Sequence, residues 1–286
     1  MTLLLSSLGA TPAGSWPEDS VLIYLLACTP DGRFGNNSEG GDDTGLFVNS
    51  PTAELVWVPD GASWDLAAHQ GRVLSTTQHG GSIWAWDPET LAEEEIGADL
   101  DEPQAIASDG QTIYFTGTDS GQLGFVATLD SKRTFTVLAE QGDAGLPMRR
   151  MEDMVIAPGG YLVIADPGVE AVWRVETDGS SAVAIVQGVE PTCVGYHEGQ
   201  LYVGTEQAVF SLNESTGELT EVEDVPAYGL FSFEGRLLAG GTSGLREVGG
   251  EALVGGLGRA AATVEIDGAL YITDQATGEV YVAEEL

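Results

Sequence analysis

The sequence predicts an all-β fold, a six-bladed β-propeller in which each blade is a four-stranded antiparallel sheet. Three observations lead to this prediction. A unit marked by a glycine turn recurs six times after about residue 52. Apolar and polar residues alternate with period two inside these units, which is typical of half-buried strands. No segment shows a sustained 3.6-residue apolar stripe with caps, so we expect helices to be nearly absent.

Each unit consists of a short apolar segment, a glycine turn and a second segment of alternating apolar residues. The glycines that open the second segments are separated by 39, 50, 39, 36 and 33 residues, which are blade-sized periods. These glycines are Gly71, Gly110, Gly160, Gly199, Gly235 and Gly268.

The fourth unit shows the four strands most clearly. Tight turns at Glu198-Gly199 and Ser215-Thr216-Gly217 separate its segments. The expected strands cover residues 192–196, 200–204, 208–212 and 218–222. Repeated units of this kind form a propeller, because each sheet buries both faces against its neighbours and the ring leaves no long open edge.

The two ends of the repeat predict how the ring closes. The sixth unit has segments at 262–266, 269–274 and 279–284 but no outer strand. Residues 52–58 form a strand without a blade of its own, and we expect this strand to complete the last blade. The count gives six blades, or seven only if residues 1–50 add strands. The expected division is a leader or tether over 1–50 and a propeller over 51–286.

Composition and charge exclude several classes of protein. The chain has 286 residues, 43% of them hydrophobic, and its 10 basic against 45 acidic residues give a net charge of −35. Such a charge repels nucleic acid and anionic lipid surfaces. No apolar stretch approaches the roughly 20 residues that span a bilayer. The carboxylates suit a hydrated surface of the kind favoured in salty surroundings, or alternatively a face that collects cations.

The two cysteines, Cys28 and Cys193, lack the spacing of a zinc site or a disulfide framework. Cys28 ends the segment Leu25-Leu26-Ala27-Cys28, which resembles the lipobox of bacterial lipoproteins and is followed by a polar, glycine-rich stretch. The resemblance implies export to the periplasm or cell surface with a lipid anchor on Cys28. Residues 1–20 lack the basic residues of a signal peptide. The alternatives are a misassigned start, or a cytoplasmic protein in which Cys28 is a core residue or pairs with Cys193.

The third unit carries a family resemblance. Residues 154–166 combine an apolar strand, a Pro-Gly-Gly turn and the segment Tyr161-Leu162-Val163-Ile164-Ala165-Asp166, and Val172-Trp173-Arg174-Val175 follows. The pattern resembles the six-bladed propellers of the NHL-repeat and gluconolactonase/regucalcin superfamily. The resemblance spans residues 52–286 and implies the fold. Its gluconolactonase-like members further imply a metal on the top face that polarises a lactone or ester carbonyl and activates water.

In a propeller, the top face collects the loops that lead into the inner strands and the loops that join the second and third strands. Carboxylates there suit Ca²⁺, which takes six to eight oxygen ligands. Glu102, Asp153 and Glu190 precede three successive inner strands and are the candidate metal ligands. The alternative is that these residues cap turns.

Further candidate residues come from the same loops. His79 and Asp166 are the candidate catalytic bases. Adjacent arginines can clamp a carboxylate or phosphate, although neighbouring acids can equally pair with them. The candidate ligand-binding residues are Trp64, Arg149, Arg150, Tyr228 and Arg259. Trp64 could stack on a sugar or pack between blades.

Two functions follow from these observations. The first is an exported ligand-binding propeller whose top-face channel takes a small molecule, a glycan or a protein. The second is a calcium-type hydrolase or lactonase that uses the top-face carboxylates. A scaffold within a larger assembly is a third reading. No G-x-S-x-G elbow and no phosphate-binding loop supports another chemistry. The sequence determines neither the ligand nor the oligomeric state.

Overall fold

The computed structural model describes residues 54–57, 63–77, 80–90, 92–119, 123–140, 148–242 and 244–283. The chain divides into Met1–Asn49 and Ser50–Leu286, and all described residues belong to the second unit. Cys28, His79 and the predicted leader lie outside the described residues. No helix in the described part of the chain is long and apolar enough to cross a membrane.

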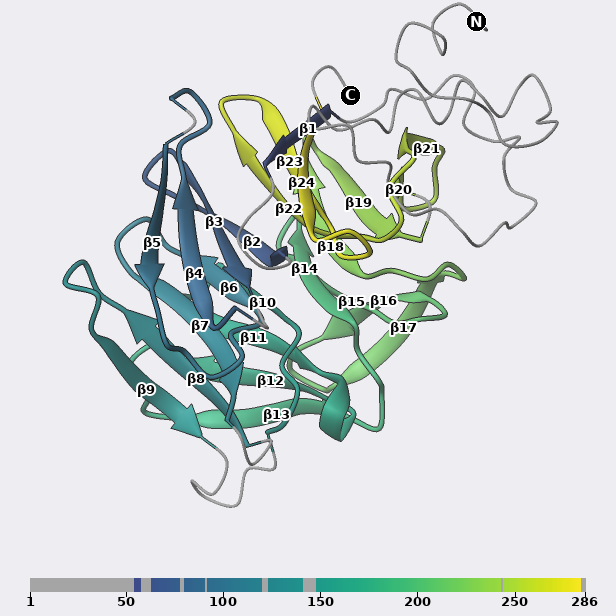
Figure 1. Cartoon of the computed structure of the whole chain (residues 1–286). Helices are drawn as coiled ribbons and strands as arrows, with labels where there is room; N and C mark the ends of the chain where they lie inside the picture. The colour runs from purple at the N-terminus through teal and green to yellow at the C-terminus, as the bar shows by residue number, and fades with distance from the viewer. Residues whose placement is uncertain are drawn as a thin grey trace, which may run out of the picture. The chain divides into compact units, whose positions relative to one another are not determined.

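The described strands form six antiparallel sheets of four strands each, which confirms the predicted blades (Figure 1). Blade 1 contains β2 (Ser63–His69), β3 (Arg72–Thr77), β4 (Ser82–Trp86) and β5 (Glu93–Gly97). Blade 2 contains β6 (Ile106–Ser108), β7 (Ile113–Thr118), β8 (Gly124–Leu129) and β9 (Phe135–Glu140). Blade 3 contains β10 (Asp153–Ile156), β11 (Tyr161–Asp166), β12 (Ala171–Glu176) and β13 (Ala182–Gln187).

Blade 4 contains β14 (Cys193–His197), β15 (Gln200–Gly204), β16 (Val209–Asn213) and β17 (Glu218–Glu223). Blade 5 contains β18 (Gly229–Phe233), β19 (Arg236–Gly241), β20 (Gly244–Glu247) and β21 (Ala252–Gly255). Blade 6 contains β22 (Ala260–Ile266), β23 (Ala269–Asp274), β24 (Glu279–Ala283) and β1 (Glu54–Trp57). The one helical segment among the described residues is the 3₁₀ turn Pro167–Val169.

The ring closes as the sequence predicts. The N-terminal strand β1 pairs antiparallel with β24, with Leu55 opposite Tyr281 and Trp57 opposite Val280. Blade 1 is also bonded to blade 6. The backbone N–H of Ser63 donates to the carbonyl of Gly278 at 3.0 Å. The hydroxyls of Ser63 and Thr273 lie 3.1 Å apart and add a second link. Residues from both ends of the chain therefore hold blades 1 and 6 together.

Tight turns join the inner strand of a blade to its second strand. In four blades the turn has two residues with positive φ, as at Glu198 (50°) and Gly199 (78°). Two successive positive φ values define the type I′ turn, whose twist matches that of the flanking strands. A glycine at the second position avoids the steric cost of this conformation. This requirement explains why a glycine marks every repeat in the sequence.

The hydrophobic core is divided among the interfaces between blades. Among the described residues, the buried hydrophobic side chains form six clusters. Each cluster contains residues from two neighbouring blades. In the cluster between blades 2 and 3, for example, Val126 packs with Leu162 and the fully buried Trp173. The alternation in the sequence thus reflects sheets that are covered on both faces.

Buried hydrogen bonds also run from one blade to the backbone of the next. The hydroxyl of Thr116 in blade 2 donates to the carbonyl of Met151 at 2.7 Å. The hydroxyl of Thr192 in blade 4 donates to the carbonyl of Ala227 in the loop before blade 5. These bonds satisfy carbonyls in the loops that lead into the inner strands, where no sheet partner is present.

The inner strands of blades 5 and 6 approach too closely for a side chain at Gly229. A Cβ atom built on Gly229 would lie 1.6 Å from the carbonyl oxygen of Ala261. This contact is with backbone, so no side-chain rotation relieves it. Gly241 offers a matched position in the same blade, since its nearest neighbour would be 3.6 Å from an added Cβ.

We expect Gly229→Ala to lower the free energy of unfolding by about 2 kcal/mol or more, because overpacking a rigid interface costs about 1–3 kcal/mol. Gly241→Ala should change stability by no more than about 0.5 kcal/mol. Urea unfolding followed by tryptophan fluorescence measures both. Equal stabilities for the two variants would contradict the close packing of blades 5 and 6.

Candidate functional site

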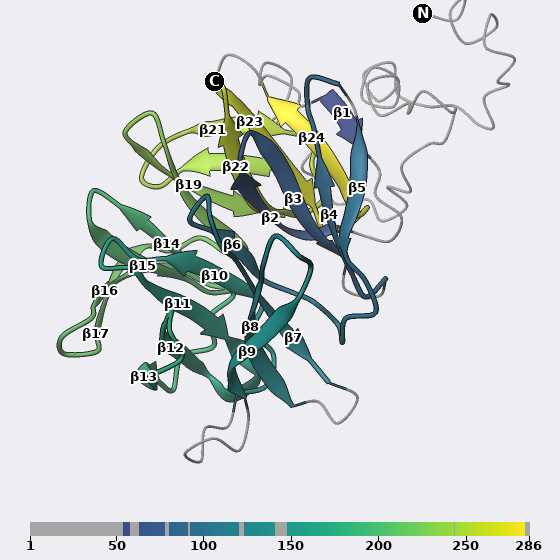
Figure 2. The same ribbon diagram turned by 90° about the vertical axis from the view of Figure 1, so that its left-hand side faces the viewer.

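The inner strands β2, β6, β10, β14, β18 and β22 surround a central channel of about 350 Å³. Figures 1 and 2 show three of these inner strands, β6, β10 and β14, side by side. We call the end at which these strands begin the top mouth. Ala68, Ser108 and Tyr196 line the channel toward the opposite end, while Asp65 and Asp153 line it near the top mouth.

Asp65 and Asp153 occupy equivalent positions in blades 1 and 3. Each carboxylate accepts the N–H of the residue after it, from Leu66 at 2.7 Å and from Met154 at 2.8 Å. The other oxygen accepts an N–H from the inner strand of the next blade. Asp65 bonds Ile106 at 2.8 Å, and Asp153 bonds Val194 at 2.7 Å. Each aspartate therefore ties two inner strands together at a strand edge that has no sheet partner.

Both carboxyl groups bind protons more tightly than an ordinary aspartate. Burial raises the pKa of Asp153 to about 7, although the N–H bonds from Val194 and Met154 act in the opposite direction. Burial also raises the pKa of Asp65 well above its usual value, and the nearby charge of Asp153 adds to that effect. Desolvation of the ionised form is the main cause in both cases.

Two further aspartates anchor the loops of the top mouth. Asp166, at the end of β11, accepts N–H bonds from Arg149 at 2.9 Å and Arg150 at 3.0 Å. Asp274, at the equivalent end of β23, accepts from Gly258 at 2.7 Å and Arg259 at 2.8 Å. Asp166 is fully buried, and Trp173 Nε1 donates to it at 3.2 Å. Asp166 therefore holds the loop that carries Arg149 and Arg150 in position.

The side chains of these anchored loops gather with charged neighbours. The guanidinium of Arg150 pairs with Glu152 at 2.7 Å. The guanidinium of Arg259 lies 3.9 Å from the centroid of the Tyr228 ring. Burial raises the pKa of Glu152, while the charges of Arg150 and Arg259 lower it and that of Glu206 raises it. Loops of blades 3, 4, 5 and 6 thus contribute to one charged cluster, which we call the mouth cluster: Arg150, Glu152, Glu206, Tyr228 and Arg259.

Arg259 differs from most arginines of the protein. Arg72, Arg133, Arg174, Arg236 and Arg246 each form an ion pair with a glutamate. Arg259 makes no ion pair with any described residue, and its recorded side-chain contact is the face of Tyr228. A partly buried guanidinium held over an aromatic ring keeps its donors available for a ligand.

The structure does not gather the predicted metal trio. Glu102 and Glu190 are exposed, whereas Asp153 lies in the channel with both oxygens accepting N–H bonds. Among the described residues no three His, Cys, Asp or Glu side chains are placed to hold a metal ion. Because Ca²⁺ requires six to eight oxygen ligands, this donor set does not fit a calcium site.

The remaining candidates have separate positions. Trp64 is partly buried, and its indole Nε1 is shielded from solvent without a partner in the described part of the protein. Gln104 is 2% exposed, and its Oε1 is likewise unpartnered among the described residues. Arg149 is exposed. Cys193 is a buried free thiol whose Sγ contacts the carbonyl of Ala227 at 3.5 Å, so it belongs to the interface of blades 4 and 5.

Asp65, Glu152 and Glu206 were not among the residues that the sequence analysis singled out. A signal for Asp65 exists, because an aspartate followed by an apolar residue lies near the start of the inner strand in both blade 1 and blade 3. The roles of Glu152 and Glu206 depend on the arginines opposite them. Arg150 lies only two residues before Glu152, but Arg259 and Glu206 come from loops of other blades, so no local pattern could identify the whole cluster.

Comparisons with known proteins support the architecture. No family model and no curated protein matches the sequence. A gluconolactonase from Xanthomonas campestris is similar in structure, with a TM-score of 0.64, 15% identity, and coverage of 83% of this chain and 96% of that one. A glucose dehydrogenase-like putative oxidoreductase from Thermus thermophilus gives a TM-score of 0.64 at 15% identity, covering 82% of this chain and 100% of that one.

A third similar structure is the PQQ-bound aldose sugar dehydrogenase of Streptomyces coelicolor, with a TM-score of 0.61 and 12% identity. The match covers 81% of this chain and 97% of that chain. These likenesses agree with the predicted resemblance to gluconolactonase-like propellers at the level of the fold. At such identities they show the fold alone.

The raised pKa of Asp153 predicts a defined pH dependence of stability. The native state binds this proton more tightly than the unfolded chain, so the contribution of Asp153 to stability falls as pH rises from about 4 to about 7. We expect Asp153→Asn to flatten the stability profile in that window, by up to about 4 kcal/mol for a shift of about three pH units. Chemical unfolding at several pH values provides the measurement.

In Asp153→Asn, the amide nitrogen replaces one carboxylate oxygen and cannot accept a backbone N–H. This loss lowers stability by a similar amount at every pH. The slope between about pH 4 and pH 7 is therefore the quantity to compare, rather than the level. Exposed Glu190, replaced by Gln, serves as the control for a general loss of one negative charge. An identical slope in the wild type and in Asp153→Asn would contradict the assignment.

Proposed function

We propose that this protein is a ligand-binding propeller whose top mouth binds a small polar molecule bearing a carboxylate and hydroxyl groups, such as a sugar acid. The observation that carries the proposal is Arg259, which lies over Tyr228 without an ion pair among the described residues. In a chain with net charge −35, an arginine at a channel mouth that makes no close ion pair with a described residue suits an incoming anion.

The rest of the mouth cluster supplies complementary groups. Glu152 and Glu206 accept hydrogen bonds from hydroxyls, and Arg150 lies beside Glu152 as a second cation. The Tyr228 ring offers an apolar face of the kind on which sugars stack. The solved relatives named as a gluconolactonase and as sugar dehydrogenases support a sugar-derived ligand. Asp166 and Asp274 hold the arginine loops in place, which reduces the entropy lost on binding.

A lactonase is the second candidate, and Asp153 favours it. This carboxyl lines the channel, and its pKa of about 7 suits a group that exchanges protons near neutral pH. In hydrolysis of a lactone, water adds to the carbonyl carbon and the ring C–O bond breaks. Asp153 in its protonated form would give its proton to the departing oxygen and recover one from the added water. Calcium dependence of the kind found in gluconolactonase-like enzymes would require ligands beyond the described donor set.

Isothermal titration calorimetry with gluconate tests the binding proposal. We expect saturable binding to the wild type, and a loss of about tenfold to a hundredfold in affinity for Arg259→Gln, since a hydrogen bond to a charged group contributes about 1.5–3 kcal/mol. Arg236→Gln is the matched control, because Arg236 also lies over an aromatic ring, Phe233, but on the hairpin at the opposite end of its inner strand. Equal affinities for the two variants would refute the proposed site.

The same preparations separate binding from catalysis. Glucono-δ-lactone is incubated with the protein in the presence of Ca²⁺ or EDTA, and acid release is compared with the buffer rate. A hydrolysis rate above that of buffer that is lost in Asp153→Asn supports the lactonase. If this rate depends on Ca²⁺, the metal ligands must include residues beyond those that the structure describes. Gluconate binding without a hydrolysis rate above that of buffer would support the binding function and contradict the lactonase.

We also propose that the protein is exported and anchored through Cys28, on the strength of the Leu25-Leu26-Ala27-Cys28 segment. Mass spectrometry of the protein from its native membranes should show a lipid-modified Cys28 as the first residue. Cys28→Ser should move the protein from the membrane fraction to the soluble fraction. An unmodified cysteine within a full-length chain would overturn this assignment.

A further inference from the structure

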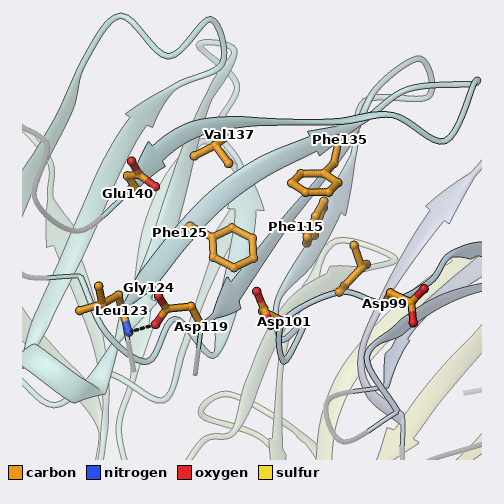
Figure 3. A pocket seen from close by; sticks show the side chains of 11 residues that line it. Asp99, Asp101, Phe115, Asp119, Leu123, Gly124, Phe125, Phe135, Val137 and Glu140 are labelled. Carbon is orange, nitrogen blue, oxygen red and sulfur yellow. Dashed lines mark hydrogen bonds between the residues drawn. The ribbon is translucent and has the colours of Figure 1, made fainter. Parts of the chain in front are cut away.

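A second pocket lies between blades 1 and 2, away from the central channel. Its volume is about 280 Å³, near the lower end of the range for small-molecule sites. It is lined by the loop Asp99, Leu100 and Asp101 that joins the two blades and by residues of β7, β8 and β9 (Figure 3). None of the channel residues described above belongs to it.

The floor of the pocket is aromatic. Phe115 is fully buried, and its ring makes edge-to-face contacts with Phe125 at 6.0 Å and with Phe135 at 6.5 Å between centroids. Phe125 can lie against β7 because Gly117 has no side chain, since an added Cβ would approach the ring within 2.3 Å. Figure 3 shows the three rings next to one another. The absence of a side chain at Gly117 therefore leaves room for the ring of Phe125 in this pocket.

The apolar surface of the pocket is unusually exposed. Five large hydrophobic side chains are exposed among the described residues, and three of them line this pocket: Leu123 at 43%, Phe135 at 52% and Val137 at 42%. Exposed apolar side chains that occur singly need no explanation. Three of them around one cavity with an aromatic floor indicate a surface that a ligand covers.

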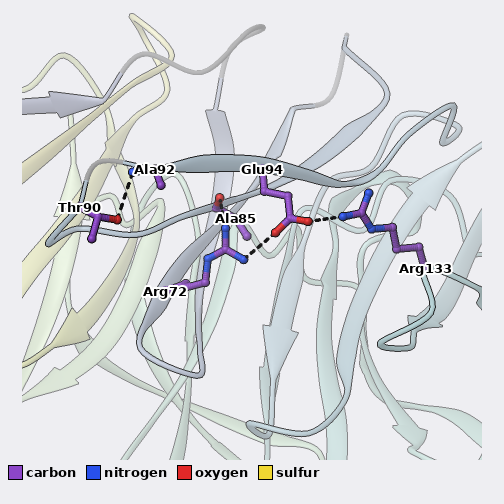
Figure 4. Close-up of polar contacts among 6 residues, drawn as sticks. All are labelled: Arg72, Ala85, Thr90, Ala92, Glu94 and Arg133. Carbon is purple, nitrogen blue, oxygen red and sulfur yellow. Dashed lines mark hydrogen bonds and ion pairs between the residues drawn. The ribbon is translucent and has the colours of Figure 1, made fainter.

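The rim of the pocket is acidic. Asp99, Asp101, Asp119 and Glu140 line it, and no Lys, Arg or His occurs among the described residues of its lining. Figure 3 shows these carboxylates around the aromatic rings, with Asp119 accepting the N–H of Leu123 at 2.8 Å. The one arginine on the neighbouring β8–β9 hairpin, Arg133, is engaged with Glu94 of β5 (Figure 4).

We infer that this pocket binds a small organic cation with an apolar head, such as a quaternary ammonium compound. Aromatic faces attract such cations through the ring quadrupole, and carboxylates at the rim complement the charge without having to be desolvated fully. The small volume favours a single ammonium head over a longer chain. An anionic or uncharged apolar ligand would not complement the negative charge at the rim.

Titration with choline tests the inference, with 3,3-dimethylbutan-1-ol as the uncharged analogue of the same shape. Calorimetry or ligand-detected NMR at constant ionic strength should give choline at least about fivefold tighter binding than the alcohol. Phe135→Ala and Glu140→Gln should each weaken choline binding about threefold to tenfold. Both side chains are exposed, so neither substitution threatens the fold.

Two controls separate the pocket from the general negative field of the protein. Glu218→Gln removes an exposed carboxylate on blade 4, and Val183→Ala shortens an exposed apolar side chain on blade 3. Both variants should bind choline as the wild type does. The inference fails if the alcohol binds as tightly as choline, if the controls weaken binding as much as the pocket variants, or if only a basic peptide and not choline saturates the pocket.

Discussion

The structure depends on joining six sheets through contacts between neighbouring blades. A propeller has no central element, so each inner strand presents one backbone edge that its own sheet leaves unpaired. In this protein, side chains reach across the interfaces to satisfy part of that edge. Asp65 accepts an N–H from β6, Asp153 accepts one from β14, and Thr116 donates to the carbonyl before β10. The hydrophobic clusters between blades then exclude water from these bonds, which strengthens them.

This structural use of aspartate changes how the acidic residues are interpreted. Asp153 was predicted to be a metal ligand, yet its two oxygens bond backbone N–H groups of blades 3 and 4. Asp166 was predicted to be a base, and it holds the loop of Arg149 and Arg150. The position of a carboxylate in the repeat does not tell whether it orients a loop, as Asp166 and Asp274 do. The sequence therefore locates the loops that form the mouth but does not assign roles within them.

The fold was predictable because its determinants are local. Glycine turns such as Glu198-Gly199 fix each hairpin, and alternation fixes the faces of the strands. Closure by the strand ahead of the first blade followed from counting segments, and the pairing of Leu55 with Tyr281 confirms it. The mouth cluster was predictable only in part. Arg150, Tyr228 and Arg259 were selected because basic and aromatic residues on these loops are scarce, whereas Glu152 joins Arg150 of its own loop to Arg259 and Glu206 of other blades.

The outer pocket follows from the same geometry of radiating sheets. Neighbouring blades diverge away from the axis, so side chains must fill a wedge that widens toward the outer strands. Between blades 1 and 2, Glu94 of β5 bonds Arg72 of its own blade at 3.1 Å and also Arg133 of blade 2, which ties the outer strands together (Figure 4). The remaining space is lined by large rings, Phe115, Phe125 and Phe135, rather than closed by aliphatic packing. The exposed ring of Phe135 leaves apolar surface toward solvent, and the joining loop places carboxylates beside the pocket. The wedge between two blades can thus form a second binding surface without altering the channel that the inner strands enclose.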